Sequence, residues 1–100
     1  MHNNITIIIV TYYSEHIIKK TLKKLSKFRV IIIENSKNLL FKKFLENRYK
    51  NVKCIIPNQN LGFGRAVNLG IKLSKTKYCL ILNPDAFTND NTIQKLYLAC

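Results

Sequence analysis

Four short apolar runs alternate along the chain with longer amphipathic stretches, and this alternation constrains the fold most strongly. The first run, residues 5–10, contains β-branched residues throughout, which is typical of a strand buried on both faces. Similar runs occupy residues 30–33, 52–56 and 78–82. Fully apolar strands separated by helices indicate parallel pairing with crossover connections. The pattern therefore predicts an α/β fold with a mostly parallel sheet of about four strands flanked by helices.

Each interval between these runs has the apolar spacing of a helix. We expect Ser14 to cap the first helix, and Asp90 or Asn91 to cap a last helix after the fourth strand. The apolar residues expected on the four helices are Ile17, Ile18, Leu22 and Leu25; Leu39, Leu40, Phe44 and Leu45; Ala66, Val67, Ile71 and Leu73; and Ile93, Leu96 and Tyr97.

The chain is strongly basic, with 17 Lys and Arg against 5 Asp and Glu and a formal charge of +12. Such a balance suggests nucleic acid or an anionic membrane as a partner. The lysines are scattered, however, and several match the solvated face of a helix. No aromatic residues interleave with a basic patch, so we expect no nucleic-acid partner. Weak peripheral attraction to acidic lipid or phosphate stays open.

The three cysteines form no C-x-x-C pair, and Cys54 and Cys79 lie inside apolar runs. We expect both to be buried free thiols, which suits a reducing compartment. These features predict a cytoplasmic protein, with the inner face of the membrane as its alternative place.

Polar residues follow three of the four predicted strands. Ligands of such sheets bind outside the carboxyl ends of the strands, near a topological switch point. This rule brings three segments to one edge: Thr11-Tyr12-Tyr13, Glu34-Asn35 and Asn83-Pro84-Asp85. Two of the five acidic residues, Glu34 and Asp85, lie there.

The loop Gly62-Phe63-Gly64 opens the third predicted helix. Glycines let the backbone approach a bulky anion, and the helix start supplies free N–H groups. Arg65 adds a donor fork that suits phosphate. An ordinary strand-to-helix turn with Arg65 in solvent is the alternative. The loop is not a dinucleotide fingerprint, because Val67 occupies the third glycine position.

Asp85 offers a hard oxygen ligand to Mg²⁺ or Mn²⁺, which usually takes one or two carboxylates together with substrate phosphates. Asn83 adds a carbonyl or an amide, and a simple turn with a capping Asp is the alternative. Glu34 stands where it could accept from a pyrimidine N3–H, and Tyr12 where it could stack on the same ring. Alternatively, Glu34 is a charge at a helix N-terminus and Tyr12 is core.

Four blocks in this order resemble the start of family-2 inverting glycosyltransferases, and the rhamnosyltransferase-like branch most of all. They are Ile9-Val10-Thr11-Tyr12-Tyr13-Ser14-Glu15, Ile33-Glu34-Asn35-Ser36, Asn60-x-Gly62-Phe63-Gly64-x-Ala66-x-Asn68-x-Gly70-Ile71 and Leu82-Asn83-Pro84-Asp85. The resemblance implies a Rossmann-like GT-A fold, a nucleotide-diphosphate sugar donor, a divalent metal, and a carbohydrate or lipid-linked acceptor.

The resemblance also implies roles for the matching positions. Thr11 and Tyr12 would line the base pocket, and Glu34 would replace the aspartate that holds uracil or thymine. Gly62, Gly64 and Arg65 would border the diphosphate, whereas Asn83 and Asp85 would form the D-x-D-like element with Asp85 on the metal. Three departures stand out: Tyr13 for the usual Asn, Glu34 for Asp, and Asn83 for the first Asp.

The family's catalytic base lies beyond the D-x-D-like element, so we expect none within these 100 residues. The chain is then the N-terminal, nucleotide-binding part of a UDP- or dTDP-dependent glycosyltransferase domain, truncated at its C-terminus. Two alternatives stay open: a basic module for nucleic acid or anionic membrane, and an inactive truncated remnant.

Overall fold

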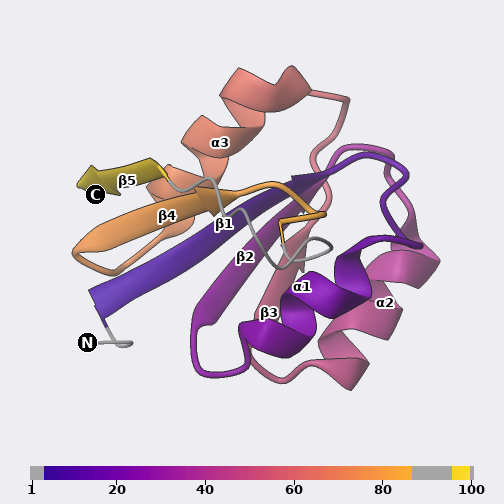
Figure 1. Ribbon diagram of the computed structural model, residues 1–100. Helices are drawn as coiled ribbons and strands as arrows, with labels where there is room; N and C mark the ends of the chain where they lie inside the picture. Colours follow the sequence, from indigo (N-terminus) through magenta and orange to yellow (C-terminus); the bar gives the residue numbers. More distant parts are fainter. Residues whose placement is uncertain (1–3, 87–95, 100) are drawn as a thin grey trace.

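The computed structural model describes residues 4–86 and 96–99. Within these residues the chain forms one sheet with the strand order β3-β2-β1-β4-β5 (Figure 1). Strands β1 to β4 pair in parallel, whereas β5 runs antiparallel to β4. The strands are β1 (Ile5–Thr11), β2 (Arg29–Glu34), β3 (Val52–Ile55), β4 (Tyr78–Leu82) and β5 (Leu96–Ala99).

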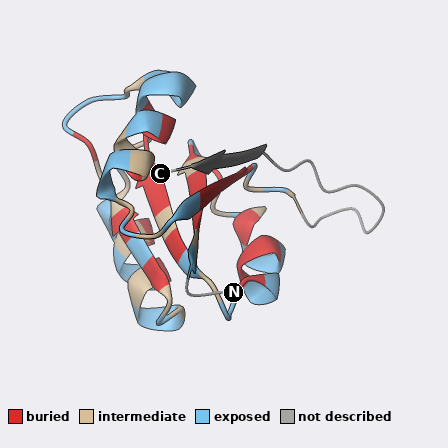
Figure 2. Cartoon of the chain, turned by 90° about the vertical axis from the view of Figure 1, so that its left-hand side faces the viewer, coloured by how far each residue is buried: buried red, intermediate tan, exposed pale blue. Residues whose placement is uncertain are grey.

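Three helices cover the two faces of the sheet: α1 (Ile18–Lys24), α2 (Leu39–Arg48) and α3 (Gly62–Leu73). Helices α1 and α2 lie on one face and α3 on the other, and the buried residues lie between these layers (Figures 1 and 2). Among the described residues, no helix is both long enough and apolar enough to cross a membrane.

The isoleucines of β1 serve both faces because successive side chains of a strand point to opposite sides. Ile7 and Ile9 belong to the larger apolar cluster beneath α1 and α2, whereas Ile8 packs in a smaller cluster with Val67 of α3. All three isoleucines are fully buried. The predicted parallel α/β sheet is thereby confirmed.

The predicted start of the first helix is wrong. The Ser14 hydroxyl accepts from the Tyr12 N–H at 3.1 Å and donates to the Tyr12 carbonyl at 3.3 Å, so it closes a turn instead of capping. Helix α1 begins at Ile18, and its N-cap residue Ile17 makes no side-chain capping bond.

The buried face of α2 also differs from the prediction. Asn38 caps this helix by accepting from the Phe41 N–H at 3.0 Å, and Phe41 and Leu45 then face the sheet one turn apart. Leu39 and Leu40 point to solvent, and Leu40 is 78% exposed. In α3, Ala66 and Val67 are buried as predicted, whereas Leu73 at the helix end is exposed.

The predicted last helix is wrong at Leu96 and Tyr97, which lie in β5. The register pairs Ile81 with Leu96 and Tyr78 with Ala99, so β5 supplies hydrogen-bond partners to the outer edge of β4. The other residues of that predicted helix, 90–95, lie outside the described part of the chain.

The cysteines follow the prediction only in part. Cys54 is a free, fully buried thiol in β3, and burial raises its pKa to about 12. Cys79 is equally buried in β4 but is disulfide-bonded. The prediction of two free thiols, which supported a cytoplasmic location, is therefore wrong for Cys79.

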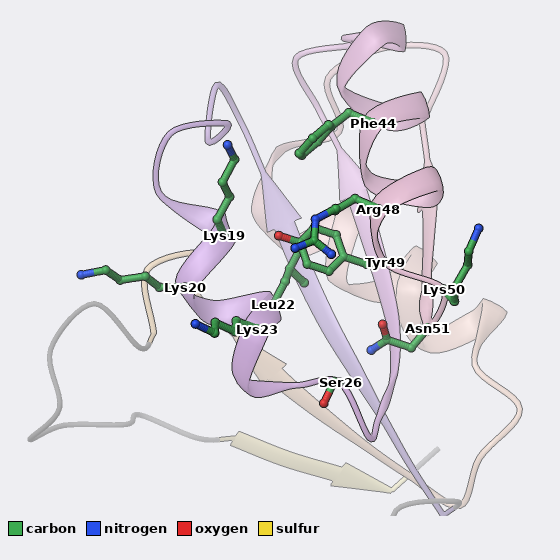
Figure 3. Close-up of a pocket in the computed structure, with 10 residues that line it drawn as sticks. All are labelled: Lys19, Lys20, Leu22, Lys23, Ser26, Phe44, Arg48, Tyr49, Lys50 and Asn51. Atoms are coloured by element: carbon green, nitrogen blue, oxygen red, sulfur yellow. The ribbon is translucent and has the colours of Figure 1, made fainter.

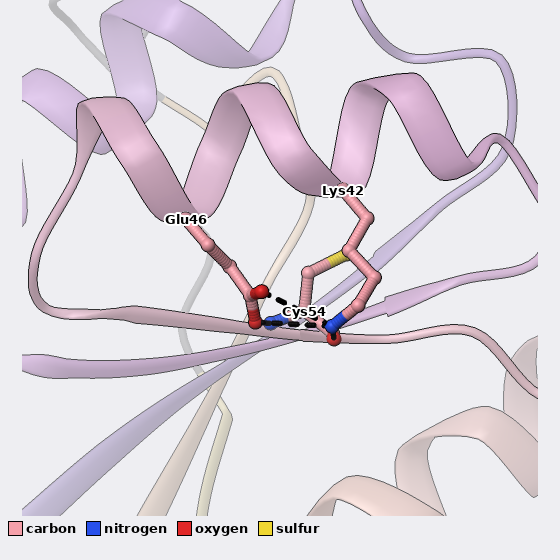
Figure 4. Close-up of polar contacts among 3 residues, drawn as sticks. All are labelled: Lys42, Glu46 and Cys54. Atoms are coloured by element: carbon pink, nitrogen blue, oxygen red, sulfur yellow. Dashed lines mark hydrogen bonds and ion pairs between the residues drawn. The ribbon is translucent and has the colours of Figure 1, made fainter.

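A lysine–glutamate pair joins α2 to β3 (Figure 4). Glu46 accepts from the Cys54 N–H at 2.9 Å, and Lys42 donates to the Cys54 carbonyl at 2.6 Å and to Glu46 at 3.1 Å. The hydrogen bond from the Cys54 N–H is the main reason that the pKa of Glu46 is lowered, and the hydrogen bond and charge of Lys42 lower it further.

Candidate functional site

The carboxyl ends of β1, β2 and β4 meet at one edge of the sheet. The register aligns Thr11 with Glu34 and Ile9 with Leu82, so the residues that follow these strands come together. The chain adds β2 and β3 on one side of β1 and then crosses to place β4 on the other side. This reversal makes the β1–β4 junction the topological switch point, where ligands of such sheets bind.

The Glu34 carboxylate is fully buried at this edge. It accepts from the Thr11 hydroxyl at 3.0 Å, from the Ser36 hydroxyl at 2.6 and 2.8 Å, and from the backbone N–H of Asn38 at 2.7 Å. Because Asn38 is the N-cap of α2, Glu34 acts here as a charge at a helix N-terminus. A base would reach the carboxylate by displacing a present donor, and of the donors in the described part of the chain only the Ser36 side chain is partly exposed.

Tyr12 and Tyr13 form an exposed aromatic pair directly after β1. Their ring centroids lie 4.5 Å apart in an edge arrangement, and Tyr12 is 57% exposed. The interpretation of Tyr12 as core is therefore wrong. Tyr13 has a left-handed φ of 54°, and its N–H donates to the Ser36 hydroxyl at 3.2 Å. Ser36 thus connects the tyrosine turn to the Glu34 carboxylate.

Asn35 brings the start of α3 to the same edge. Its amide nitrogen donates to the Gly62 carbonyl and its amide oxygen accepts from the Leu61 N–H, both at 3.3 Å. The Asn35 backbone N–H donates to the Thr11 carbonyl at 2.9 Å, and the side chain is buried. One residue therefore connects the ends of β1 and β2 to the glycine loop.

The glycine loop has the geometry of a backbone-exposed turn. Gly62 has a φ of 73°, a conformation that favours glycine, and its N–H donates to the Asn60 side-chain oxygen at 2.8 Å. A Cβ on Gly64 would meet no atom within 4 Å, so the backbone there faces open space. Arg65 is exposed on the first turn of α3.

Residues 83–86 form a turn after β4, in which the Ala86 N–H donates to the Asn83 carbonyl at 3.1 Å. The Thr21 hydroxyl of α1 donates to the Pro84 carbonyl at 2.7 Å and holds the turn in place. The side chains of Asn83 and Asp85 are exposed.

The metal-binding capacity of this edge rests on Asp85. Among residues 4–86 and 96–99, no group of three or more His, Cys, Asp or Glu side chains could hold a metal ion. Glu34 is occupied by its own donors. A single carboxylate still fits Mg²⁺ or Mn²⁺ when substrate phosphates and water supply most ligands, which is how these ions usually bind.

Sequence reasoning missed the residues that connect the site: Asn35 and Ser36 as bridges, and Lys37, whose amino group donates to the Asn58 carbonyl at 2.6 Å. They are polar residues directly after a buried strand at the ligand edge, and Asn35 and Ser36 also lie in a block that carries the family resemblance.

Comparisons with known proteins agree with this geometry. Residues 6–99 match the model of the family described as glycosyl transferase family 2. No match is found among curated proteins.

Two similar solved structures illustrate the fold. The crystal structure of S. aureus TarS 1-349 is 25% identical with a TM-score of 0.68, and the match covers 81% of this chain and 27% of that one. The mannosyltransferase PcManGT from Pyrobaculum calidifontis is 15% identical with a TM-score of 0.70, covering 83% of this chain and 28% of that one.

The chain thus spans about a quarter of the length of these proteins. The family match covers nearly all of it, and the fold is that of GT-A structures. The chain therefore belongs to glycosyltransferase family 2.

Proposed function

We propose that this chain is the nucleotide-sugar-binding part of an inverting, metal-dependent glycosyltransferase of the rhamnosyltransferase-like branch. Its donor would be a UDP- or dTDP-linked sugar, and the acceptor of the whole enzyme a carbohydrate or a lipid-linked saccharide. One observation carries the proposal: the residues after β1, β2 and β4 and the start of α3 converge on one switch point, in a member of family 2.

The base would lie against the exposed Tyr12 ring beside Thr11. We assign the pyrimidine N3–H to Glu34, whose carboxylate would exchange its Ser36 donor for the base. The exchange retains three hydrogen bonds to a buried charge, counting those from Thr11 and Asn38. It avoids the penalty of an unpaired buried carboxylate.

The diphosphate would lie over the Gly62–Gly64 loop at the start of α3. The free N–H groups of a helix start and its positive dipole end favour an anion there, and Arg65 supplies an exposed cation nearby. Asn35 would hold this loop next to the base pocket through its hydrogen bonds to Leu61 and Gly62.

Asp85 would hold Mg²⁺ or Mn²⁺ at the turn after β4, with Asn83 beside it. When bound, the ion neutralises charge that develops on the leaving diphosphate. The acceptor hydroxyl would be deprotonated by a general base that we do not assign to any residue of this chain.

Nucleotide-dependent stabilisation tests the proposal. The melting temperature is measured with UDP, dTDP and GDP, each with and without Mn²⁺; GDP is included because the PcManGT structure, alike in fold, holds GDP-Man and Mn²⁺. We expect UDP or dTDP to raise it, and more so with the metal.

Asp85→Asn should abolish the metal-dependent increase only. Glu46→Gln removes the same charge from α2, away from the site, and should leave that increase intact. Failure of every nucleotide to stabilise the protein would refute the proposal.

A further inference from the structure

A hollow lies outside the donor site, between α1 and α2 (Figure 3). It is an open groove of about 960 Å³, bounded by the helices and by the turn before β3. Five of its ten lining residues are cations: Lys19, Lys20, Lys23, Arg48 and Lys50. No carboxylate of the described residues lines it.

The groove extends away from the donor edge. Helices α1 and α2 run from the carboxyl edge of the sheet toward the edge where the strands begin (Figure 1). Ser26, Lys50 and Asn51 lie beyond the ends of these helices and line the groove. A nucleotide at the β1–β4 junction would therefore leave the groove accessible.

Apolar side chains continue this basic surface along α2. Leu40 and Phe44 lie one helical turn apart and are 78% and 41% exposed. Phe44 lines the groove itself, with the Lys19 amino group 5.3 Å from its ring centroid. Exposed apolar residues bordered by cations are typical of helices that rest on a membrane surface.

We propose that the α1–α2 groove and the Leu40–Phe44 stripe form a docking surface for a membrane rich in anionic lipid. The cations would meet lipid phosphates while Leu40 and Phe44 enter the boundary with the acyl chains. Nucleic acid fits this surface less well, because single strands stack on free aromatic faces. Leu40 is aliphatic, and the two aromatic rings that line the groove already have cations over them, Lys19 over Phe44 and Arg48 over Tyr49.

Vesicle co-sedimentation of the full chain tests the proposal, with phosphatidylcholine alone and with added phosphatidylglycerol. The wild type should bind only the anionic vesicles. The variant K19Q/K23Q/R48Q should lose about a hundredfold in affinity, from the usual contribution of each cation near an anionic surface. The matched control K72Q/K75Q/K77Q removes the same charge from exposed lysines of the α3–β4 region and should lose far less.

The apolar contribution has its own pair of variants. Leu40→Ser should weaken binding to anionic vesicles several-fold, whereas Leu73→Ser, at an exposed leucine of α3, should not. Circular dichroism checks that all variants remain folded.

Equal losses in the two triple variants would overturn the proposal, because net charge alone would then explain binding. Equal binding to neutral vesicles would overturn it as well. Groove-dependent binding to a single-stranded oligonucleotide, without vesicle binding, would assign the surface to nucleic acid instead.

Discussion

Gly70 of α3 packs directly against Ile8 of the sheet, and replacing it with alanine should separate the two. A Cβ at this position would lie 2.6 Å from the Cγ2 of Ile8 and 3.3 Å from its Cγ1 and Cδ1. Ile8 is a fully buried β-branched residue of β1, so its methyl groups have little room to move. The helix must therefore shift outward, or the strand must distort.

The magnitude follows from two opposing terms. Overpacking a buried contact costs about 1–3 kcal/mol. Alanine in place of glycine inside a helix returns about 1 kcal/mol. Gly64→Ala is the matched control, because Gly64 lies in the same helix and its new Cβ would meet nothing within 4 Å. The two variants should therefore differ by the packing penalty alone, with Gly70→Ala less stable than the wild type.

Urea unfolding followed by far-UV circular dichroism measures both variants. In a domain of this size, a difference of 1 kcal/mol shifts the melting temperature by about 4–8 °C, so thermal unfolding gives an independent reading. In an Ile8→Ala background, Gly70→Ala should become stabilising, since the obstructing methyl groups are gone. If Gly70→Ala raised the stability of the otherwise wild-type protein as much as Gly64→Ala does, this account of α3 packing would be refuted.

Asn35→Asp replaces the donor to the Gly62 carbonyl with a buried carboxylate oxygen, so it should lower the thermal stability and weaken nucleotide binding about tenfold, both measured by calorimetry; unchanged affinity would contradict its positioning role. Because folding lowers the pKa of Glu46, this carboxylate stabilises the protein above its unfolded pKa, and the effect is lost as pH falls through the folded value. Glu46→Gln should therefore destabilise the protein at pH 7, and this loss should shrink as pH falls through the folded pKa; an equal loss at every pH in urea unfolding would exclude this linkage. Burial raises the pKa of Cys54 to about 12, so iodoacetamide should modify this thiol only in denaturant, as peptide mass spectrometry would detect.

The sequence predicts the sheet well because each parallel strand is a continuous apolar run that can be recognised from its own residues. A run such as Ile7-Ile8-Ile9 is buried on both sides only if helices cover both faces of the sheet. Right-handed crossover connections then leave few possible strand orders. The sequence does not predict strand β5, because its own residues have a helix-like spacing. Its strand conformation depends on pairing with β4, which lies earlier in the chain.

The errors in the helices have a similar origin. Ser14 matches an N-cap by type, but its hydroxyl forms equally good bonds within the turn at Tyr12. Leu40 matches an apolar helical face, but α2 packs on the sheet through Phe41 and Leu45, which leaves Leu40 on the solvent side. Local sequence allows both outcomes, and tertiary contacts choose between them.

The site was predictable as a place and less so as a set of contacts. The strand-end rule brings Glu34 to the ligand edge from sequence alone, and the register agrees. The hydrogen bonds of Glu34 and Asn35 depend on the positions at which α2 and α3 begin. The partners of the Asn35 side chain lie 26 and 27 residues away along the chain.

The Lys42–Glu46 pair has a consequence for how the sheet can grow. On the side of β3 away from β2, the Cys54 N–H and carbonyl are occupied by Glu46 and Lys42, and the Val52 N–H donates to the Tyr49 carbonyl at 3.2 Å. A strand from a second molecule would find few free partners on this border, which limits edge-to-edge aggregation.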